Sequence, residues 1–363
     1  MLATYRIDQF NLLNKLFDLE VVYLYDSMQG LKINQKALEA QCNFRFSYFL
    51  RGIKYGARVF RFGIYKKIKE AKPDIIMGYE YSLTTQYLLF LRSLGLIHQK
   101  IGSMIDDSMD MCHHVQTRVR ELALNQTAER LDFLVVMSNE VSRFYQKRFN
   151  LNEHKIIVSP ILQITERLRK EPDRLETYAQ NYVEKYNLSG KKVLLYVGRF
   201  VPEKALPFFL DTISPILQER GDTRFVLVGE GAEREALTTI IKEKNIEGKV
   251  LFPGKYQSQE LYGWYLSASG FVLPSISEPF GAVINESLIF GLPVLCSQLA
   301  GASVLINSEN GLIFDPLDKG DTVEKVNLFL KQIKPVDNIC LISKIPLIED
   351  FRNDFIREWK KLL

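Results

Sequence analysis

The chain has 363 residues, of which 47% are hydrophobic and 25% are charged, and its formal net charge is +4. This length suggests about two domains, and the composition is that of an ordinary globular protein with buried cores. The small net charge gives no argument for nucleic-acid binding, and the absence of short repeats or low-complexity tracts argues against a solenoid.

The cysteines, the N-terminal residues and the most apolar stretch argue against a disulfide-rich, secreted or membrane-spanning protein. Four scattered cysteines fit neither a disulfide framework nor paired metal ligands: Cys42, Cys112, Cys296 and Cys340. Residues 1–6 lack the basic-then-apolar pattern of a signal peptide, and the most apolar stretch, 87–97, is too short to span a bilayer. We therefore expect a cytoplasmic protein.

Short apolar runs alternate with longer amphipathic stretches along the whole chain. This alternation is typical of parallel sheets covered by helices, so the predicted fold class is α/β. In the first half we expect strands at 19–25, 74–78, 101–105, 133–137 and 156–158. In the second half we expect strands at 193–197, 225–228, 250–252, 271–273, 293–296 and 312–314.

A polar, charged segment at 165–192 separates the two sets of strands. It predicts an N-terminal domain at 1–165 and a C-terminal domain at 166–347. At the end of the chain, Phe351, Phe355 and Trp359 recur at intervals of four, which predicts an amphipathic helix over 348–363.

The segment 44–69 combines aromatic residues with a local excess of positive charge. Its cations include Arg51, Lys54, Arg58, Arg61, Lys66, Lys67 and Lys69, and its aromatic residues include Phe46, Tyr48, Phe49, Tyr55, Phe60, Phe62 and Tyr65. One interpretation is a surface that contacts an anionic membrane face or a lipid-diphosphate acceptor. The other is a solvated helix whose aromatic side chains lie in the core.

The most informative stretch is 277–286, Ser-Glu-Pro-Phe-Gly-Ala-Val-Ile-Asn-Glu, which follows an apolar strand and opens a helix reaching about Phe290. Gly281 lets backbone approach a ligand, and the free amides of the first helical turn suit the oxygens of a diphosphate. Glu286 leans back toward the helix start, and Glu278 lies on the preceding turn. We expect one glutamate to bind a ribose and the other a hexose, although such a pair is more often a solvated cap.

Two further turns follow buried strands. Gly198, Arg199 and Lys204 come after the strand at 193–197, and the two cations balance the roughly two negative charges of a diphosphate. The turn Gly229-Glu230-Gly231 comes after the strand at 225–228, but Arg234 stands where a dinucleotide fingerprint needs its third glycine. An NAD-dependent oxidoreductase is therefore disfavoured.

Together these residues resemble the retaining glycosyltransferases of the large family 4, which have the GT-B fold of two Rossmann-like domains facing across a cleft. The resemblance spans 191–318 and rests on 198–204, the Val-Gly-Glu-Gly turn, 252–254, the Glu-x7-Glu element, 291–294 and 310–314. It implies transfer of a hexose with retention, from a UDP- or GDP-sugar to a saccharide or lipid-linked saccharide hydroxyl, in polysaccharide or glycolipid assembly. It also implies that no cofactor is needed and that the C-terminal helix packs back on the N-terminal domain.

The resemblance assigns roles to individual residues. Arg199 and Lys204 would bind the donor diphosphate, Glu286 the ribose and Glu278 the transferred sugar. The rest of the donor site would be Gly198, Gly229, Phe280, Gly281 and Ala282. Catalytic roles are expected for Glu278, Arg199, Lys204 and Asp106.

The first half departs from the family pattern in three ways. The chain begins near the helix that should follow the first strand, so we expect that strand to be missing. Asp106 stands where many members carry a histidine against the donor sugar, and we expect it to line the sugar site, accept a proton or cap the next helix. Ser159-Pro160-Ile161 replaces the usual Asn-Gly turn.

The stretch 106–114 contains aspartates and histidines that suggest a metal site. Adjacent residues on a helix point in different directions and no second cluster supplies ligands, so we expect no metal. Two alternatives to a transferase stay open: a non-catalytic sugar-nucleotide-binding subunit, and an epimerase of the same fold. The basic segment also leaves open a location at the inner face of the membrane.

Overall fold

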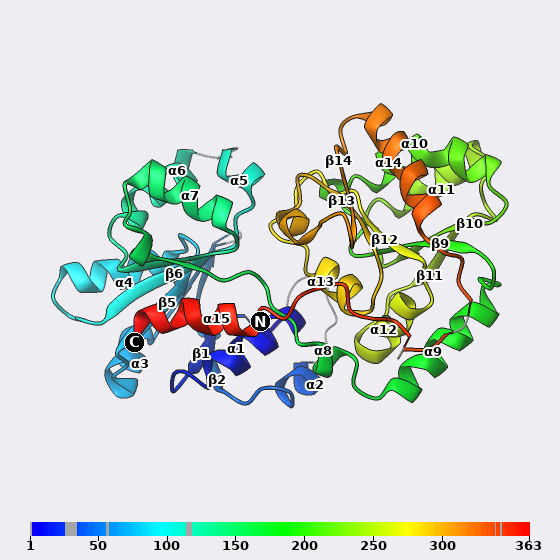
Figure 1. The fold of residues 1–363 in the computed structure, drawn as a ribbon. Coiled ribbons are helices and arrows are strands. Elements are labelled where there is room, and N and C mark those ends of the chain that lie inside the picture. The colour runs from blue at the N-terminus through cyan, green and yellow to red at the C-terminus, as the bar shows by residue number, and fades with distance from the viewer. Residues whose placement is uncertain (1, 26–34, 56–57, 114–117, 338, 342) are drawn as a thin grey trace. The chain divides into compact units, whose positions relative to one another are not determined.

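The structure is a computed structural model that describes residues 2–25, 35–55, 58–113, 118–337, 339–341 and 343–363 (Figure 1). The chain divides into two compact units. Unit 1 contains Met1–Gln163 and Asp350–Leu363, and unit 2 contains Ile164–Glu349. Within the described ranges, no helix combines the length and the apolar character that crossing a bilayer requires.

Unit 2 is built on a parallel sheet with the strand order β11-β10-β9-β12-β13-β14. Its strands are β9 (Lys192–Val197), β10 (Thr223–Val228), β11 (Val250–Gly254), β12 (Gly270–Leu273), β13 (Val294–Ser297) and β14 (Gly311–Phe314). The chain moves outward from β9 through β10 and β11, then returns to the other side of β9 with β12. The strand order therefore reverses between β9 and β12, and such a switch point leaves a crevice at the carboxyl ends of the strands.

Helices cover both faces of this sheet, which explains why its strands are apolar throughout (Figure 1). One group of helices is α10 (Leu206–Glu219), α11 (Arg234–Glu243) and α14 (Lys319–Gln332). The other face carries α9 (Pro172–Lys185), α12 (Ser258–Leu266) and α13 (Ala282–Ile289), with α8 (Thr165–Leu168) against α13. Short 3-10 turns, η3 (Pro202–Lys204) and η4 (Gly301–Leu305), follow β9 and β13.

Unit 1 contains a parallel sheet with the order β5-β6-β7-β8, a parallel pair β1-β2 and an antiparallel hairpin β3-β4. The strands are β1 (Glu20–Tyr23), β2 (Arg45–Tyr48), β3 (Gly52–Tyr55), β4 (Arg58–Arg61), β5 (Ile75–Tyr79), β6 (Lys100–Ile105), β7 (Phe133–Val136) and β8 (Ile156–Val158). The helices are η1 (Thr4–Arg6), α1 (Ile7–Leu13), α2 (Gln35–Glu39), α3 (Ile64–Ala71), α4 (Leu83–Ser93), α5 (Met109–His113), α6 (Arg118–Ala128), α7 (Asn139–Phe149), η2 (Glu153–Lys155), α15 (Arg352–Trp359) and η5 (Lys360–Leu362).

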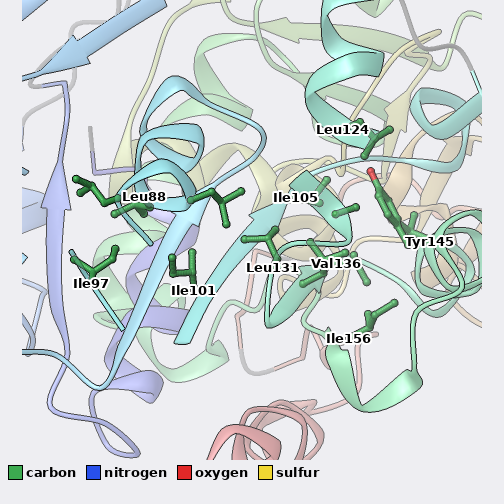
Figure 2. Close-up of a cluster of buried hydrophobic side chains, with 14 of the residues drawn as sticks. Leu88, Ile97, Ile101, Ile105, Leu124, Leu131, Val136, Tyr145 and Ile156 are labelled. Atoms are coloured by element: carbon green, nitrogen blue, oxygen red, sulfur yellow. The ribbon is translucent and has the colours of Figure 1, made fainter. Parts of the chain in front are cut away.

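The main core of unit 1 lies between the larger sheet and the helices α4, α6 and α7. Figure 2 shows Leu88, Ile97, Ile101, Ile105, Leu124, Leu131, Val136, Tyr145 and Ile156 in this cluster. Full burial of each such aliphatic side chain contributes roughly 1.5–3 kcal/mol. The hydroxyl of Tyr145 donates to Asp107 Oδ2 at 2.8 Å, so the one polar atom of this large ring is satisfied.

The strands predicted from the apolar runs are confirmed to within a residue or two at each end. The helical interpretation of 44–69 is wrong, because the segment forms β2 and the β3-β4 hairpin before α3 begins. Its aromatic and β-branched residues, such as Ile53, Val59 and Phe60, fit a pleated surface better than a helix.

The C-terminal segment belongs to unit 1 and packs against β8 and α1. The indole Nε1 of Trp359 donates to Ser159 Oγ at 3.1 Å, and the ring meets Phe17 edge-on with centroids 6.5 Å apart. The carboxylate of Glu358 accepts from the amide of Val158 at 3.1 Å. This helix therefore satisfies polar groups of the edge strand β8 as well as covering its apolar surface.

Replacing Trp359 with alanine should destabilise unit 1 by about 3–5 kcal/mol, because it removes a buried ring and leaves the Ser159 hydroxyl without this partner. Chemical denaturation monitored by circular dichroism measures the change. Asn353→Ala, at an exposed position of the same helix, is the matched control and should alter stability little. Equal stabilities of the two variants would contradict the packing described for α15.

Candidate functional site

Two loops leave the carboxyl edge of the unit 2 sheet where the strand order reverses. The loop after β9 ends in η3, and the loop after β12 leads into α13. The amides of Ile276 and Ser277 donate to the carbonyl of Glu203 at 3.0 and 3.3 Å. The two loops are therefore joined through their backbones into one surface at the switch point.

A third loop, after β13, closes against the second. The amide of Gly301 donates to the carbonyl of Glu278 at 3.1 Å, and that of Ala302 donates to Phe280 at 2.7 Å. A Cβ on Gly301 would lie 2.1 Å from the carbonyl oxygen of Pro279, so only glycine permits this approach. This loop is not among the site residues predicted from the sequence, although Gly301, a glycine a few residues beyond a buried strand, is a local signal for it.

The helix α13 begins at this surface. Gly281 precedes it with φ +98°, a left-handed conformation that residues with a Cβ rarely adopt. The first amides of a helix have no partner inside it and carry the positive end of its dipole. At the other end of α13, Arg169 donates to the carbonyl of Ile289 at 3.5 Å, which places a cation near the negative end.

Lys204 and Glu278 meet at the centre of this surface. The ammonium of Lys204 donates to Glu278 Oε2, and each side chain is 14% exposed. Burial, followed by the charge of Glu278, raises the pKa of Tyr196 and of Cys296. The carboxylate of Glu278 is therefore close enough to Tyr196 in β9 and to Cys296 in β13 for its charge to affect both side chains.

Arg199 lies on the same loop as Lys204, with its side chain exposed to solvent. Its backbone is held on both sides, because the amide of Gly198 donates to Val228 at 3.0 Å and that of Phe200 donates to Glu230 at 2.9 Å. The hydroxyl of Tyr196 donates to the carbonyl of Arg199 at 2.9 Å. Among the described residues no acidic side chain pairs with its guanidinium.

Gly198 and Gly229 bring the turns after β9 and β10 into contact. Gly229 has φ +147°, and a Cβ there would lie 1.8 Å from the carbonyl oxygen of Gly198. A Cβ on Gly198 would lie 2.6 Å from the hydroxyl of Tyr196. Both glycines thus serve the packing of the loops, and their contact with a ligand stays a prediction.

Glu286 lies one turn inside α13 and is 6% exposed. Its Oε2 accepts a hydrogen bond from the hydroxyl of Tyr265 at 2.7 Å. Phe280 is buried at the mouth of the same helix, beside Gly281 and Ala282. The structure thus brings Lys204 and Glu278 together near the start of α13 and gives Glu286 a partner, Tyr265, which no sequence pattern had indicated. A joint role of these residues in donor binding stays a prediction.

Asp106 lies in unit 1, after β6. Arg6 Nη2 donates to its two carboxylate oxygens at 2.6 and 2.5 Å, and the hydroxyl of Tyr79 donates to it at 2.7 Å. Burial by itself lowers the pKa of Arg6, but the charge and hydrogen bond of Asp106 outweigh it and the pKa is raised. Ser108, whose Oγ accepts from the amide of Met111 at 3.3 Å, caps the next helix. A role of Asp106 at the sugar stays a prediction.

The described residues hold no cluster of three or more histidine, cysteine or acidic side chains arranged to bind a metal ion. Of the stretch 106–114, His114 lies outside the described residues. Metal independence therefore stays a prediction.

Residues 179–339 match the family Glycosyl transferases group 1. The match covers most of unit 2. One relative is the 2-deoxystreptamine N-acetyl-D-glucosaminyltransferase of Niallia circulans, 28% identical over 46% of this chain and 43% of that enzyme. Another is the O-antigen chain mannosyltransferase B of Escherichia coli, 24% identical over 61% of this chain and 58% of that enzyme. The chain thus spans less than two thirds of the length of these curated relatives.

Solved structures resemble nearly the full length of the chain. Alr3699/HepE of Anabaena, in complex with UDP, has a TM-score of 0.73 at 16% identity and covers 99% of this chain and 97% of its own. A glycosyltransferase of Rickettsia africae has a TM-score of 0.64 at 15% identity and covers 97% and 88%. At such identities the likeness establishes the fold, which is GT-B, as the sequence predicted.

Gly229→Ala should destabilise unit 2 by about 1–3 kcal/mol and weaken binding of nucleoside diphosphates, because the new methyl group collides with the carbonyl of Gly198. Urea denaturation and calorimetric titration measure the two effects. Gly221→Ala, where a Cβ would meet nothing within 4 Å, is the matched control. If both variants behaved alike, the close approach of the two turns would be disproved.

Proposed function

We propose that this chain is a hexosyltransferase that moves a sugar, with retention and without a metal, from a nucleotide-diphosphate sugar to a hydroxyl acceptor. The proposal rests chiefly on the ion pair between Lys204 and Glu278, which lies near the N-terminus of α13 where the strand order of the sheet reverses. This site lies within residues 179–339, which match glycosyl transferases group 1. The Niallia and Escherichia relatives are named as sugar transferases, which supports the same reaction class.

The charges of the site suit a diphosphate. The cations Arg199 and Lys204 and the amides at the start of α13 would bind its oxygens. Glu278 would then accept hydrogen bonds from the transferred sugar, and Glu286 from the ribose. UDP in the Anabaena structure supports a uridine donor, and a GDP-sugar is the other candidate.

The ion pair between Lys204 and Glu278 suggests that the diphosphate binds before Glu278 contacts the sugar. A buried ion pair is stabilising only while both partners are compensated. An incoming diphosphate brings about two negative charges, so it competes with Glu278 for the ammonium of Lys204. The carboxylate of Glu278 is thereby released toward the hydroxyls of the sugar.

During transfer, the bond between the sugar carbon and the diphosphate oxygen breaks, and a bond to the acceptor oxygen forms on the same face of the ring. The acceptor hydroxyl gives its proton to the departing diphosphate. Negative charge grows on the departing phosphate. Fixed cations and amides aimed at that charge bind the transition state more tightly than the ground state, which is the condition for catalysis.

Arg199→Ala should lower kcat by about a hundredfold or more, because losing one such fixed donor typically costs roughly 3 kcal/mol of transition-state stabilisation. Steady-state assays of diphosphate release measure it once a donor is identified. Lys242→Ala removes an exposed cation from α11 and should leave kcat unchanged. Near-normal turnover in Arg199→Ala would contradict the assignment.

The reaction class itself is tested by incubating the protein with radiolabelled UDP- and GDP-sugars and candidate saccharide acceptors. A transferase releases nucleoside diphosphate and labels the acceptor. Binding without release would favour a non-catalytic subunit, and a changed sugar still attached to its nucleotide would favour an epimerase.

We further propose that the segment 44–69 contacts anionic lipid at the inner face of the membrane, near a lipid-linked saccharide acceptor. The β3-β4 hairpin exposes Ile53, and the turn between β4 and α3 exposes Phe62; they are 61% and 48% accessible. A pocket of about 410 Å³ beside them is lined by Tyr48, Phe49, Leu50, Arg51, Phe62, Gly63, Lys66, Lys67 and Glu70. Exposed apolar side chains next to cations are the combination that membrane surfaces attract.

Ile53→Asp should reduce sedimentation of the protein with anionic liposomes, because it places a negative charge where an apolar side chain would enter the lipid. High salt should weaken binding of the unaltered protein by screening the cations. Leu317→Asp, at a 66% exposed position in unit 2, is the control and should bind as the unaltered protein does. No association with lipid at either salt concentration would remove the membrane proposal.

A further inference from the structure

Tyr265 is a wholly buried residue of α12 that lies next to Glu286. Its hydroxyl donates to Glu286 Oε2 at 2.7 Å. The ring stacks on Phe290 with centroids 5.8 Å apart and planes 4° from parallel, and it lies 6.0 Å from the ring of Phe271. Aromatic neighbours on two elements therefore hold the hydroxyl in one place.

The direction of this hydrogen bond is also fixed. Burial, followed by the negative charge of Glu286, raises the pKa of Tyr265 well above its usual value, so the phenol keeps its proton. A phenol has one proton to donate, and a bond to an ionised acceptor is stronger than one between neutral groups. One oxygen of Glu286 is thus held, and rotation of its carboxylate is restricted.

We propose that Tyr265 is a positioning residue for nucleotide recognition, which orients the carboxylate of Glu286 toward the ribose hydroxyls of the donor. This inference rests on the proposed role of Glu286 in binding the ribose. Tyr265 is not a catalytic residue, because it is buried and acts through Glu286.

A positioning role of Tyr265 has a consequence that a purely structural role would not have. A carboxylate held in one orientation accepts well from a pair of ribose hydroxyls, and one that rotates freely must be ordered at binding. Removing the tyrosine hydroxyl should therefore weaken binding of a ribonucleotide more than binding of its deoxy analogue. A general loosening of the domain would weaken both equally.

The test is calorimetric titration of the full chain with UDP or GDP, whichever binds, and with its 2′-deoxy and 3′-deoxy forms. Tyr265→Phe should lose about tenfold in affinity for the ribonucleotide and little for the deoxy forms. The ratio of the affinity for the ribonucleotide to the affinity for a deoxy form should therefore fall toward one. Tyr262→Phe removes a hydroxyl from the same helix and leaves the Tyr265–Glu286 bond in place, so its ratio should stay that of the unaltered protein.

Glu286→Gln distinguishes the positioning role of Tyr265 from the ribose-binding role of Glu286. If it lowers the ratio and Tyr265→Phe does not, the positioning role is overturned and the ribose role of Glu286 stands. If Glu286→Gln also leaves the ratio unchanged, the ribose role itself fails and the inference fails with it.

A second measurement does not depend on the stability of Tyr265→Phe. With 3-fluorotyrosine incorporated at position 265, the ¹⁹F resonance should shift when the ribonucleotide binds and shift much less with the 2′,3′-dideoxy analogue. Equal shifts with both nucleotides would contradict coupling between Tyr265 and the ribose.

Discussion

The carbonyl of Glu203, which accepts from the amides of Ile276 and Ser277, joins the loop after β9 to the loop before α13. The candidate site depends on this junction, because it brings Lys204 beside Glu278. The topology of the sheet makes the junction available, since β9 and β12 are neighbours although they are far apart in the sequence. The reversal of strand order between β9 and β12 therefore leaves the crevice and also places Lys204 and Glu278 beside each other.

Part of the site's charge is paired internally, while the exposed guanidinium of Arg199 has no acidic partner in the described part of the chain. Glu278 compensates Lys204, and Tyr265 holds Glu286, while the start of α13 presents its positive end to the same surface. Such a surface suits a ligand with a strongly negative centre between two polyols. A nucleotide-diphosphate sugar has this layout, with its diphosphate between a ribose and a hexose.

Much of the fold was predictable from the sequence, because strands buried on both faces of a sheet are apolar throughout and recur between amphipathic helices. The segment 44–69 was not, since its charged and aromatic residues suggest a helical surface as readily as the hairpin that it forms. In the site, Lys204, Glu278 and Gly281 were predictable because they follow buried strands. Tyr265 was not, because its role arises from a contact between the neighbouring helices α12 and α13 that no local pattern contains. Gly301 follows a buried strand as well, but the contact of its amide with the carbonyl of Glu278 joins two loops and is not encoded locally.

The central claim is that a donor diphosphate binds where Lys204 now meets Glu278. A crystal structure with a bound nucleoside diphosphate tests it most directly. The account predicts phosphate oxygens within hydrogen-bond distance of Lys204 Nζ and of the first amides of α13, with the Lys204–Glu278 bond broken. A diphosphate bound elsewhere, with that ion pair intact, would contradict the account.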